Sequence, residues 1–226
     1  MIDKAAFRSL SYGLYIVTTK GPRGAAGCVA NTFAQVTSDP ARVSVALNKD
    51  NATTAAIVEA GVFEAAPLTQ SAPMELIGRF GFHTSADTDK FADTRTADDA
   101  AGVPYVAEHT AAHFLARVRE TVDLGTHLLI VGDVEQAETL SSEEPMTYAY
   151  YHRVKGGKTP PKAPSYQGEE DPQPAQEASA GEAAPVRKTA WRCTVCGHVE
   201  YVDELPEGFV CPVCGVGREM FERIEL

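Results

Sequence analysis

Short apolar segments separated by turn-forming residues recur through the first two thirds of the chain. Residues 12–19 and 26–34 lie on either side of a Gly-Pro-Arg-Gly turn and predict a β-hairpin. In residues 42–47 large apolar side chains alternate with smaller or polar ones, which is typical of a strand with one buried face. By the same criteria we expect further strands over 62–67, 113–123, 126–137 and 146–152.

Helical patterns are few and short. We expect helices over 3–10, which Asp3 would cap, and over 53–60 and 73–79. Many strands with only a few short helices predict a mainly β fold of the barrel type.

The composition changes sharply after residue 156. From there to residue 188 the chain is rich in Pro, Ala, Glu, Gln and Gly, and it has almost no large apolar residue after Tyr166. Such a segment cannot bury enough surface to offset its conformational entropy. We therefore predict a large domain over 1–166, a flexible linker over 167–188 and a small domain over 189–226.

Four of the five cysteines form two Cys-x-x-Cys-Gly knuckles in the small domain. They are Cys193 and Cys196, followed by Cys211 and Cys214. Four thiolates at this spacing suit one tetrahedral metal ion. The spacing alone fits an electron-transferring iron as well as a structural zinc.

Length, charge and composition narrow the function classes. The chain has 226 residues, 44% of them hydrophobic, and a formal net charge of −11. The negative charge argues against nucleic-acid and anionic-membrane partners. We find no apolar run of membrane-spanning length and no signal-peptide pattern at the N-terminus. Cysteines in metal spacing favour a reducing compartment, so we expect a cytoplasmic protein.

Two clusters of small polar residues stand out in the large domain, at 31–40 (NTFAQVTSDP) and 48–54 (NKDNATT). The second ends where a helix is predicted to begin. Hydroxyls, amides and a lysine at a helix N-terminus can hold a phosphate. Helix capping by Asn51 or Thr53 explains the same residues equally well. We find no glycine-rich dinucleotide loop, P-loop or Ser-His-Asp elbow.

Segments spread over nearly all of 1–166 resemble the flavin reductase-like split-barrel family. They are 12–19, 31–40, 48–53, 76–82, 89–91, 132–134, 144–152 and 162–166. The resemblance implies a homodimeric split β-barrel that binds FMN without a covalent bond, near the subunit interface. It also implies transfer of a hydride from a nicotinamide to N5 of the flavin.

The same resemblance implies three groups of flavin-binding residues. Those beside the isoalloxazine and ribityl chain would be Asn31, Thr32, Gln35, Thr37 and Ser38. Those near the phosphate would be Lys49, Asn51, Thr53 and Thr54. The loop after the second helix would contribute Phe82, Ser85 and Lys90. In this loop the chain has His83-Thr84-Ser85-Ala86, whereas the family usually has a basic residue followed by Ser-Gly.

Two further residues of the large domain could approach the flavin. The resemblance implies that His127 faces the nicotinamide and flavin as a hydrogen-bond donor, although Thr126 precedes it where family members often have aspartate. The alternative is a histidine whose role is only structural. Cys28 lies shortly before Asn31, but a lone thiol is more often a small buried apolar residue.

Residues 191–221 resemble a rubredoxin beyond the four cysteines. The supporting residues are Trp191, Val195, the segment 205–209 (LPEGF), Pro212 and Phe221. Trp191, Tyr201, Phe209 and Phe221 could form an aromatic core that keeps water from the sulfurs. The knuckles are closer in sequence than in the longest rubredoxins, and zinc ribbons share the cysteine spacing, so zinc stays an alternative.

The whole chain resembles the high-molecular-weight rubredoxins, a flavin reductase-like domain fused to a rubredoxin. This implies that electrons pass from NAD(P)H through FMN to one FeS4 iron. It implies an onward acceptor such as a flavodiiron protein that reduces oxygen or nitric oxide. One alternative is an NAD(P)H:flavin reductase with a structural zinc ribbon. Another is a non-enzymatic FMN and iron electron carrier.

Overall fold

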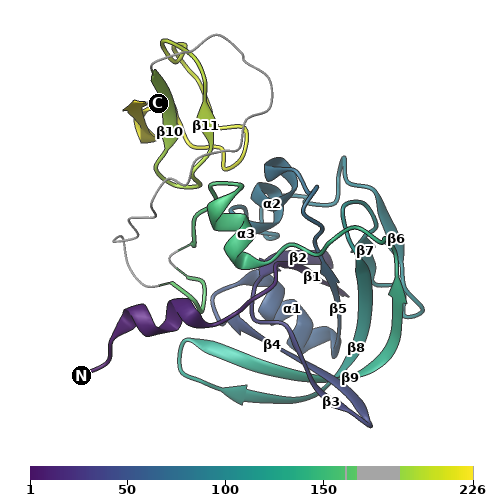
Figure 1. Cartoon of the computed structure of the whole chain (residues 1–226). Coiled ribbons are helices and arrows are strands. Elements are labelled where there is room, and N and C mark those ends of the chain that lie inside the picture. The colour runs from purple at the N-terminus through teal and green to yellow at the C-terminus, as the bar shows by residue number, and fades with distance from the viewer. Residues whose placement is uncertain (161, 167–188, 226) are drawn as a thin grey trace.

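The computed structural model describes residues 1–160, 162–166 and 189–225. They form a mainly β domain and a small metal-binding domain near the C-terminus (Figure 1). The predicted linker, 167–188, lies outside the described residues. No helix within the described residues is both long and apolar enough to cross a membrane.

A curved sheet of seven antiparallel strands forms the first domain, in the order β2-β1-β5-β8-β9-β4-β3. The strands of this sheet are β1 (Tyr15–Gly21), β2 (Gly24–Ala30), β3 (Ala34–Ser38), β4 (Ala41–Asn48), β5 (Val62–Pro67), β8 (Ala112–Asp123) and β9 (His127–Thr139). A separate hairpin joins β6 (Thr96–Asp98) to β7 (Pro104–Val106). This mainly β split barrel confirms the predicted fold class.

The core of the barrel forms where inward side chains of the strands meet one helix. The helix is α1 (Ala52–Ala60), and its Ile57 packs among Val17, Val45, Phe63 and Ile130. The long β8–β9 hairpin curves round this core (Figure 1). Two register shifts in the β8–β9 pairing account for the bend, because an irregular pairing increases local twist.

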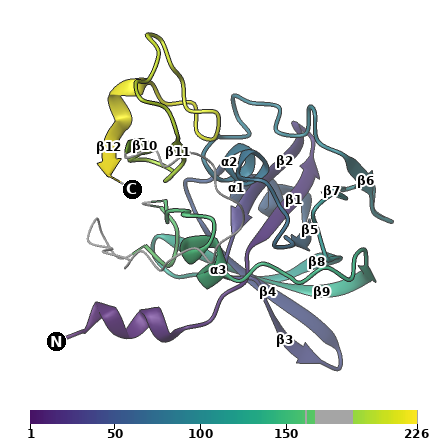
Figure 2. The ribbon, with the colours of Figure 1, turned by 45° about the horizontal axis from the view of Figure 1, so that its top comes forward.

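Two further helices lie on the side of the barrel that faces the metal domain, α2 (Met74–Gly81) and α3 (Tyr148–Arg153) (Figures 1 and 2). The predicted strand over 146–152 is wrong, because α3 occupies most of it. Thr147 caps this helix by accepting a hydrogen bond from the Tyr150 amide. The aromatic residues that suggested a strand pack with helical spacing, since Tyr148 stacks on Tyr151 with a centroid distance of 5.7 Å.

Three other differences from the predicted elements concern short pieces. The opening helix is a 3-10 helix, η1 (Lys4–Ser9). The polar segment 31–40 contains β3, whose residues are all exposed, so it lacks the alternation that marks a half-buried strand. The β6–β7 hairpin was not predicted either, because three-residue strands show no period.

The metal domain has a three-stranded sheet in the order β11-β10-β12. Its elements are β10 (Thr189–Cys193), β11 (Val199–Glu200), the 3-10 helix η2 (Arg218–Met220) and β12 (Phe221–Glu225). Its core consists of the four knuckle cysteines with Leu205, Val213 and Phe221.

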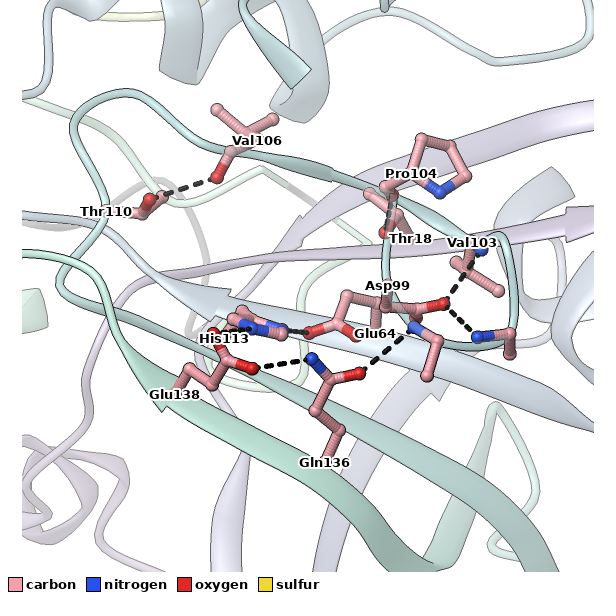
Figure 3. A network of polar contacts seen from close by, with 12 residues as sticks. Thr18, Glu64, Asp99, Val103, Pro104, Val106, Thr110, His113, Gln136 and Glu138 are labelled. Atoms are coloured by element: carbon pink, nitrogen blue, oxygen red, sulfur yellow. Dashed lines mark hydrogen bonds and ion pairs between the residues drawn. The ribbon is translucent and has the colours of Figure 1, made fainter. Parts of the chain in front are cut away.

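A buried polar network lies between the barrel wall and the β6–β7 hairpin (Figure 3). The fully buried Glu64 of β5 contacts His113 Nδ1 at 3.1 Å, and Tyr105 stacks on the imidazole at 4.2 Å. Asp99 lies against Glu64 and accepts hydrogen bonds from the amides of Ala101 and Val103. Burial and the neighbouring Asp99 carboxyl raise the pKa of Glu64 to about 10.

We expect Glu64→Gln to flatten the dependence of stability on pH. With a pKa of about 10 in the folded chain against 4.5 for the free side chain, Glu64 keeps a proton that the unfolded chain loses. Wild-type stability should therefore fall as pH rises between these values. A neutral glutamine removes this dependence, so the variant should gain about 4 kcal/mol on wild type between pH 5 and pH 8, because each pH unit in this range costs wild type about 1.4 kcal/mol.

Denaturant unfolding at pH 5, 6.5 and 8 measures this difference. The matched control is Glu59→Gln, because Glu59 is an exposed partner of Arg23. The control should keep the wild-type slope. If the free energy of unfolding changed with pH in the same way for wild type and Glu64→Gln, Glu64 would be ionised in the folded chain.

Candidate functional site

The four knuckle thiols converge on one point in the metal domain. All four cysteines are buried, and their sulfurs lie within 4.8 Å of one another. The Sγ–Sγ distance is 3.6 Å between Cys193 and Cys214 and 3.5 Å between Cys196 and Cys211. A tetrahedral ion with metal–sulfur bonds of about 2.3 Å needs sulfurs roughly 3.8 Å apart. The donor set therefore fits a single iron or zinc ion.

The two knuckles have the same backbone geometry, which their glycines permit. Gly197 and Gly215 adopt φ of +83° and +73°, where a side chain would be strained. The Gly197 amide donates to Cys193 O and the Gly215 amide to Cys211 O, each at 2.9 Å. These turns bring the second cysteine of each pair back towards the first.

Burial and hydrogen bonding act in different proportions on the thiols. Burial raises the pKa of Cys196 and of Cys214. For Cys193 burial also opposes ionisation, but donation from the Cys196 and Val195 amides outweighs it and lowers the pKa. Since a metal ligand must lose its proton, metal binding to this centre should release protons and strengthen with pH.

An apolar shell surrounds the sulfurs. Phe209 and Phe221 pack edge to face at 5.3 Å, and Trp191 lies against the same cluster. Tyr201 was expected in this aromatic core, but its side chain is 58% exposed. Tyr201 directly follows β11, outside the buried cluster, so the expectation was wrong for this residue.

Several of the polar residues predicted to bind the flavin meet at one end of the barrel. The Asn31 amide donates to Ser165 Oγ at 2.6 Å. His127 is paired with Asn48 across β4 and β9, and its Nε2 lies 3.3 Å from Lys162 O. Asn48 Nδ2 donates to the same carbonyl at 3.2 Å. The segment 162–166 therefore lies over Asn31 and His127.

The N-terminus of α1 lies next to this group. Asn51 is the N-cap of the helix and accepts from the Thr53 amide at 2.9 Å, so the capping interpretation of this residue is confirmed. Thr54 Oγ1 donates to Asn48 O at 2.7 Å. Lys49 pairs with Asp123 on the surface. The Thr53 hydroxyl is buried without a hydrogen bond of ordinary geometry and lies beside the Cys28 sulfur.

A third group converges on Gly27 of β2. Ser85 Oγ lies 3.1 Å from both the amide and the carbonyl of Gly27. The Lys90 ammonium donates to Gly27 O at 2.8 Å and to Phe80 O at 3.1 Å. Burial lowers the pKa of Lys90 to about 8. Cys28 follows Gly27 in the chain and is buried in the barrel core, where burial raises the pKa of its thiol.

The remaining predicted residues lie apart from these groups or are used by the backbone. Thr32 Oγ1 donates to Ala46 O and accepts from the Ala46 amide across β4. Phe82 packs on the core of the metal domain. Gln35, Thr37 and Ser38 lie on the exposed strand β3, and the described contacts do not bring them to the others.

Sequence reasoning left out Asn48 and Ser165 of this region, and also two residues that act through backbone atoms. The backbone of Gly27 forms hydrogen bonds with Ser85 and Lys90. The backbone carbonyl of Lys162 contacts Asn48 and His127. Both residues make these contacts through backbone atoms, which every residue has, so the residue type gives no signal in the sequence. The resemblance over 162–166 was the one available signal. Together the hydroxyls, side-chain amides, helix N-terminus and buried ammonium form a donor set that fits a flavin with its phosphate.

Two family models match separate parts of the chain. Residues 7–157 match the flavin reductase like domain, and residues 191–222 match the rubrerythrin, rubredoxin-like domain. A likeness of fold extends to an NADH:FAD oxidoreductase of Streptomyces globisporus solved with NAD and FAD fragments. It has a TM-score of 0.58 and 21% identity, and the match covers 65% of this chain and 90% of that chain.

Two curated relatives match at higher identity. The ferric-chelate reductase (NAD(P)H) of Archaeoglobus fulgidus is 44% identical over 73% of this chain and 98% of its own length. The high molecular weight rubredoxin of Moorella thermoacetica is 39% identical over 99% of this chain and 100% of its own length. The chain thus belongs to the flavin reductase-like family and, within it, to the high molecular weight rubredoxins, which join that domain to a rubredoxin-like one.

Proposed function

We propose that the protein is an oxidoreductase that passes electrons from NAD(P)H through FMN in the barrel to iron in the metal domain. The observation that supports this most is that one chain combines a flavin reductase-like barrel with four buried thiols arranged round a single point. Flavin-binding and rubredoxin-like domains on one chain are suited to a relay, whereas a structural ribbon needs no redox partner.

The cofactors supply the electron chemistry and the chain positions them. When bound, FMN accepts two electrons from the nicotinamide and gives them up singly, and iron changes by one electron. The α1 N-terminus with Asn51 and Thr54 would hold the phosphate, because free amides at a helix N-terminus favour an anion. The buried Lys90 adds positive charge near Cys28. The segment 162–166 contacts Asn31 and His127 at that end of the barrel.

Absorption spectra before and after anaerobic addition of NADH, with metal analysis, test this proposal. We expect one iron per chain, a bound flavin, and loss of both the flavin and the ferric–thiolate absorption on reduction. Zinc in place of iron would favour the alternative of a flavin reductase with a structural ribbon. A flavin that stays oxidised in NADH would favour the non-enzymatic carrier.

We propose that His127 is a hydrogen-bond donor to the nicotinamide–flavin pair. Its Nδ1 is 2.8 Å from Thr126 Oγ1, and its Nε2, which lies 3.3 Å from Lys162 O, would exchange that carbonyl for the nicotinamide–flavin pair. His127→Phe should slow flavin reduction by NADH about tenfold, since one such bond stabilises by about 1.4 kcal/mol.

Stopped-flow kinetics at flavin wavelengths measure this effect, with flavin content checked first. His127→Gln is the matched control, because it keeps a side-chain donor and should recover part of the rate. Reduction of the His127→Phe flavin at the wild-type rate would leave His127 with a structural role only.

The proposal extends to partners and location. The acceptor would be a redox protein such as a flavodiiron oxygen or nitric oxide reductase, in the cytoplasm. A homodimer would place the FMN near its interface. Val36 on β3 and Leu124 at the tip of the β8–β9 hairpin are 50% and 57% exposed, and each is an apolar side chain that a subunit contact would cover. Light scattering of the holoprotein would give the mass in solution.

A further inference from the structure

The metal domain packs against one face of α2. Met74, Gly78 and the cap residue Phe82 follow one another at intervals of four, so they share a face of the helix. Met74 and Phe82 contact the apolar cluster round the four sulfurs. The opposite face of α2 buries Ile77 and Phe80 in the barrel. The views in Figures 1 and 2 agree that the metal domain lies beside α2 and α3.

Gly78 permits the close approach of the two domains. A Cβ at Gly78 would overlap the Val213 carbonyl oxygen and would lie 2.6 Å from Val213 Cγ1. The three atoms nearest to this added Cβ all belong to Val213, which lies between Cys211 and Cys214 in the second knuckle. A glycine in the middle of a helix is unfavourable for the helix itself. Here it allows the helix backbone to touch the knuckle.

Both knuckles face the barrel. A Cβ at Gly197, after the first pair of cysteines, would overlap the Gly156 carbonyl oxygen. Lys158 Nζ donates to Thr194 O at 3.1 Å, inside the same knuckle. In the second knuckle, a Cβ added at Gly215 would lie 3.4 Å from the His83 ring. Val213 is consequently 1% exposed.

The contact surface is continuous with the candidate flavin site. Phe82 touches the metal domain, and Ser85, three residues later, bonds to Gly27. Gly27 precedes Cys28, which neighbours Asn51 and Lys90. A short stretch of chain therefore joins the knuckle surface to the groups proposed to hold the flavin.

We propose that this docked arrangement is the one in which the iron receives electrons from the flavin of the same chain, through the two knuckles. It rests on the proposed function. Each NAD(P)H oxidised to NAD(P)+ releases one proton and two electrons. The two electrons reduce two ferric centres to ferrous, or they reduce one centre twice, with that centre passing its first electron to the acceptor in between. Because the barrel covers the knuckle surface, delivery to an external protein through that surface requires the metal domain to leave the barrel first.

Gly78→Ala tests the docking, with Gly81→Ala as the matched control. Both variants add one methyl group to α2, and both replace a glycine by an alanine, so the change in intrinsic helix propensity is matched. At Gly81 the new Cβ would meet Val29 at 3.6 Å, which is ordinary contact, whereas at Gly78 it would strike Val213. Overpacking of this kind should lower the docked population about tenfold or more.

Two measurements on the full-length holoprotein report the result. Small-angle X-ray scattering should give a larger radius of gyration for Gly78→Ala than for wild type and Gly81→Ala. Stopped-flow mixing with NADH should show unchanged flavin reduction and iron reduction slowed about tenfold in Gly78→Ala only. Iron reduction at the wild-type rate in that variant would overturn the proposal, as would an extended wild type in scattering.

Delivery is tested with chemically prereduced protein and oxidised cytochrome c as a protein-sized acceptor. Gly78→Ala should oxidise at least as fast as wild type, because its knuckles are uncovered. Slower delivery by the variant would contradict the need for undocking. If wild-type iron stays ferric in NADH, the proposed function itself fails, and scattering still reports whether the domains dock through Gly78.

Discussion

Cys211→Ser is expected to leave the reduction of the flavin by NADH unchanged and to stop electron transfer to the proposed acceptor protein. The substitution removes one of four converging thiolates, and a serine hydroxyl is a poor ligand for this kind of site. Loss of a group that only orients a metal ligand commonly costs about 10- to 100-fold in metal affinity or activity, so loss of a ligand itself should cost more.

The barrel should tolerate this change. Among the residues predicted to bind the flavin, Phe82 is the one that packs on the metal domain within the described contacts. Asn31, Asn51 and Lys90 make their contacts inside the barrel domain. Apart from Phe82, flavin reduction therefore depends on groups that the substitution does not reach.

Stopped-flow flavin reduction and steady-state turnover with the acceptor separate the two steps. Cys28→Ser is the matched control, because Cys28 is a buried thiol of the barrel core and not a metal ligand in this arrangement. It should retain transfer to the acceptor. Undiminished transfer by Cys211→Ser would mean that electrons leave the flavin directly, without the metal centre.

Removal of the metal is expected to unfold the small domain while the barrel stays folded. Apart from the four cysteines, the buried core of this domain consists of Leu205, Val213 and Phe221. A domain of fewer than about 40 residues seldom folds without a metal or disulfides. Metal binding to four-ligand sites of small domains supplies roughly 10–16 kcal/mol, which is also their folding free energy.

Trp191 makes this prediction easy to measure, because it is the single tryptophan of the chain and lies in the small domain. Its indole Nε1 is 3.4 Å from Asp203 O, and its ring packs on the metal cluster. Chelation under reducing conditions should shift its fluorescence to longer wavelength. Far-UV circular dichroism of the barrel should change little. An unshifted emission after complete metal loss would show that the apolar core suffices.

The metal centre and the outline of the barrel were predictable from sequence because their signals are local. The knuckles place two cysteines and a glycine within five residues, and the glycine φ values follow directly. The β1–β2 hairpin was predicted from its turn, and its pairing runs from Tyr15↔Ala30 to Gly21↔Gly24. Local patterns failed where one segment suits two structures, as in 146–152, where the Thr147 cap decides for a helix.

The amino-acid sequence by itself determined the metal ligands, the mainly β architecture and the family. Only the tertiary structure decided which distant groups meet. Glu64, Asp99 and His113 come from separate elements, and so do Asn31, His127 and Ser165. The contact of Gly78 with Val213 joins residues that no periodicity relates. The physical reason is that such contacts depend on strand register and domain packing, which arise from many weak interactions summed over the fold.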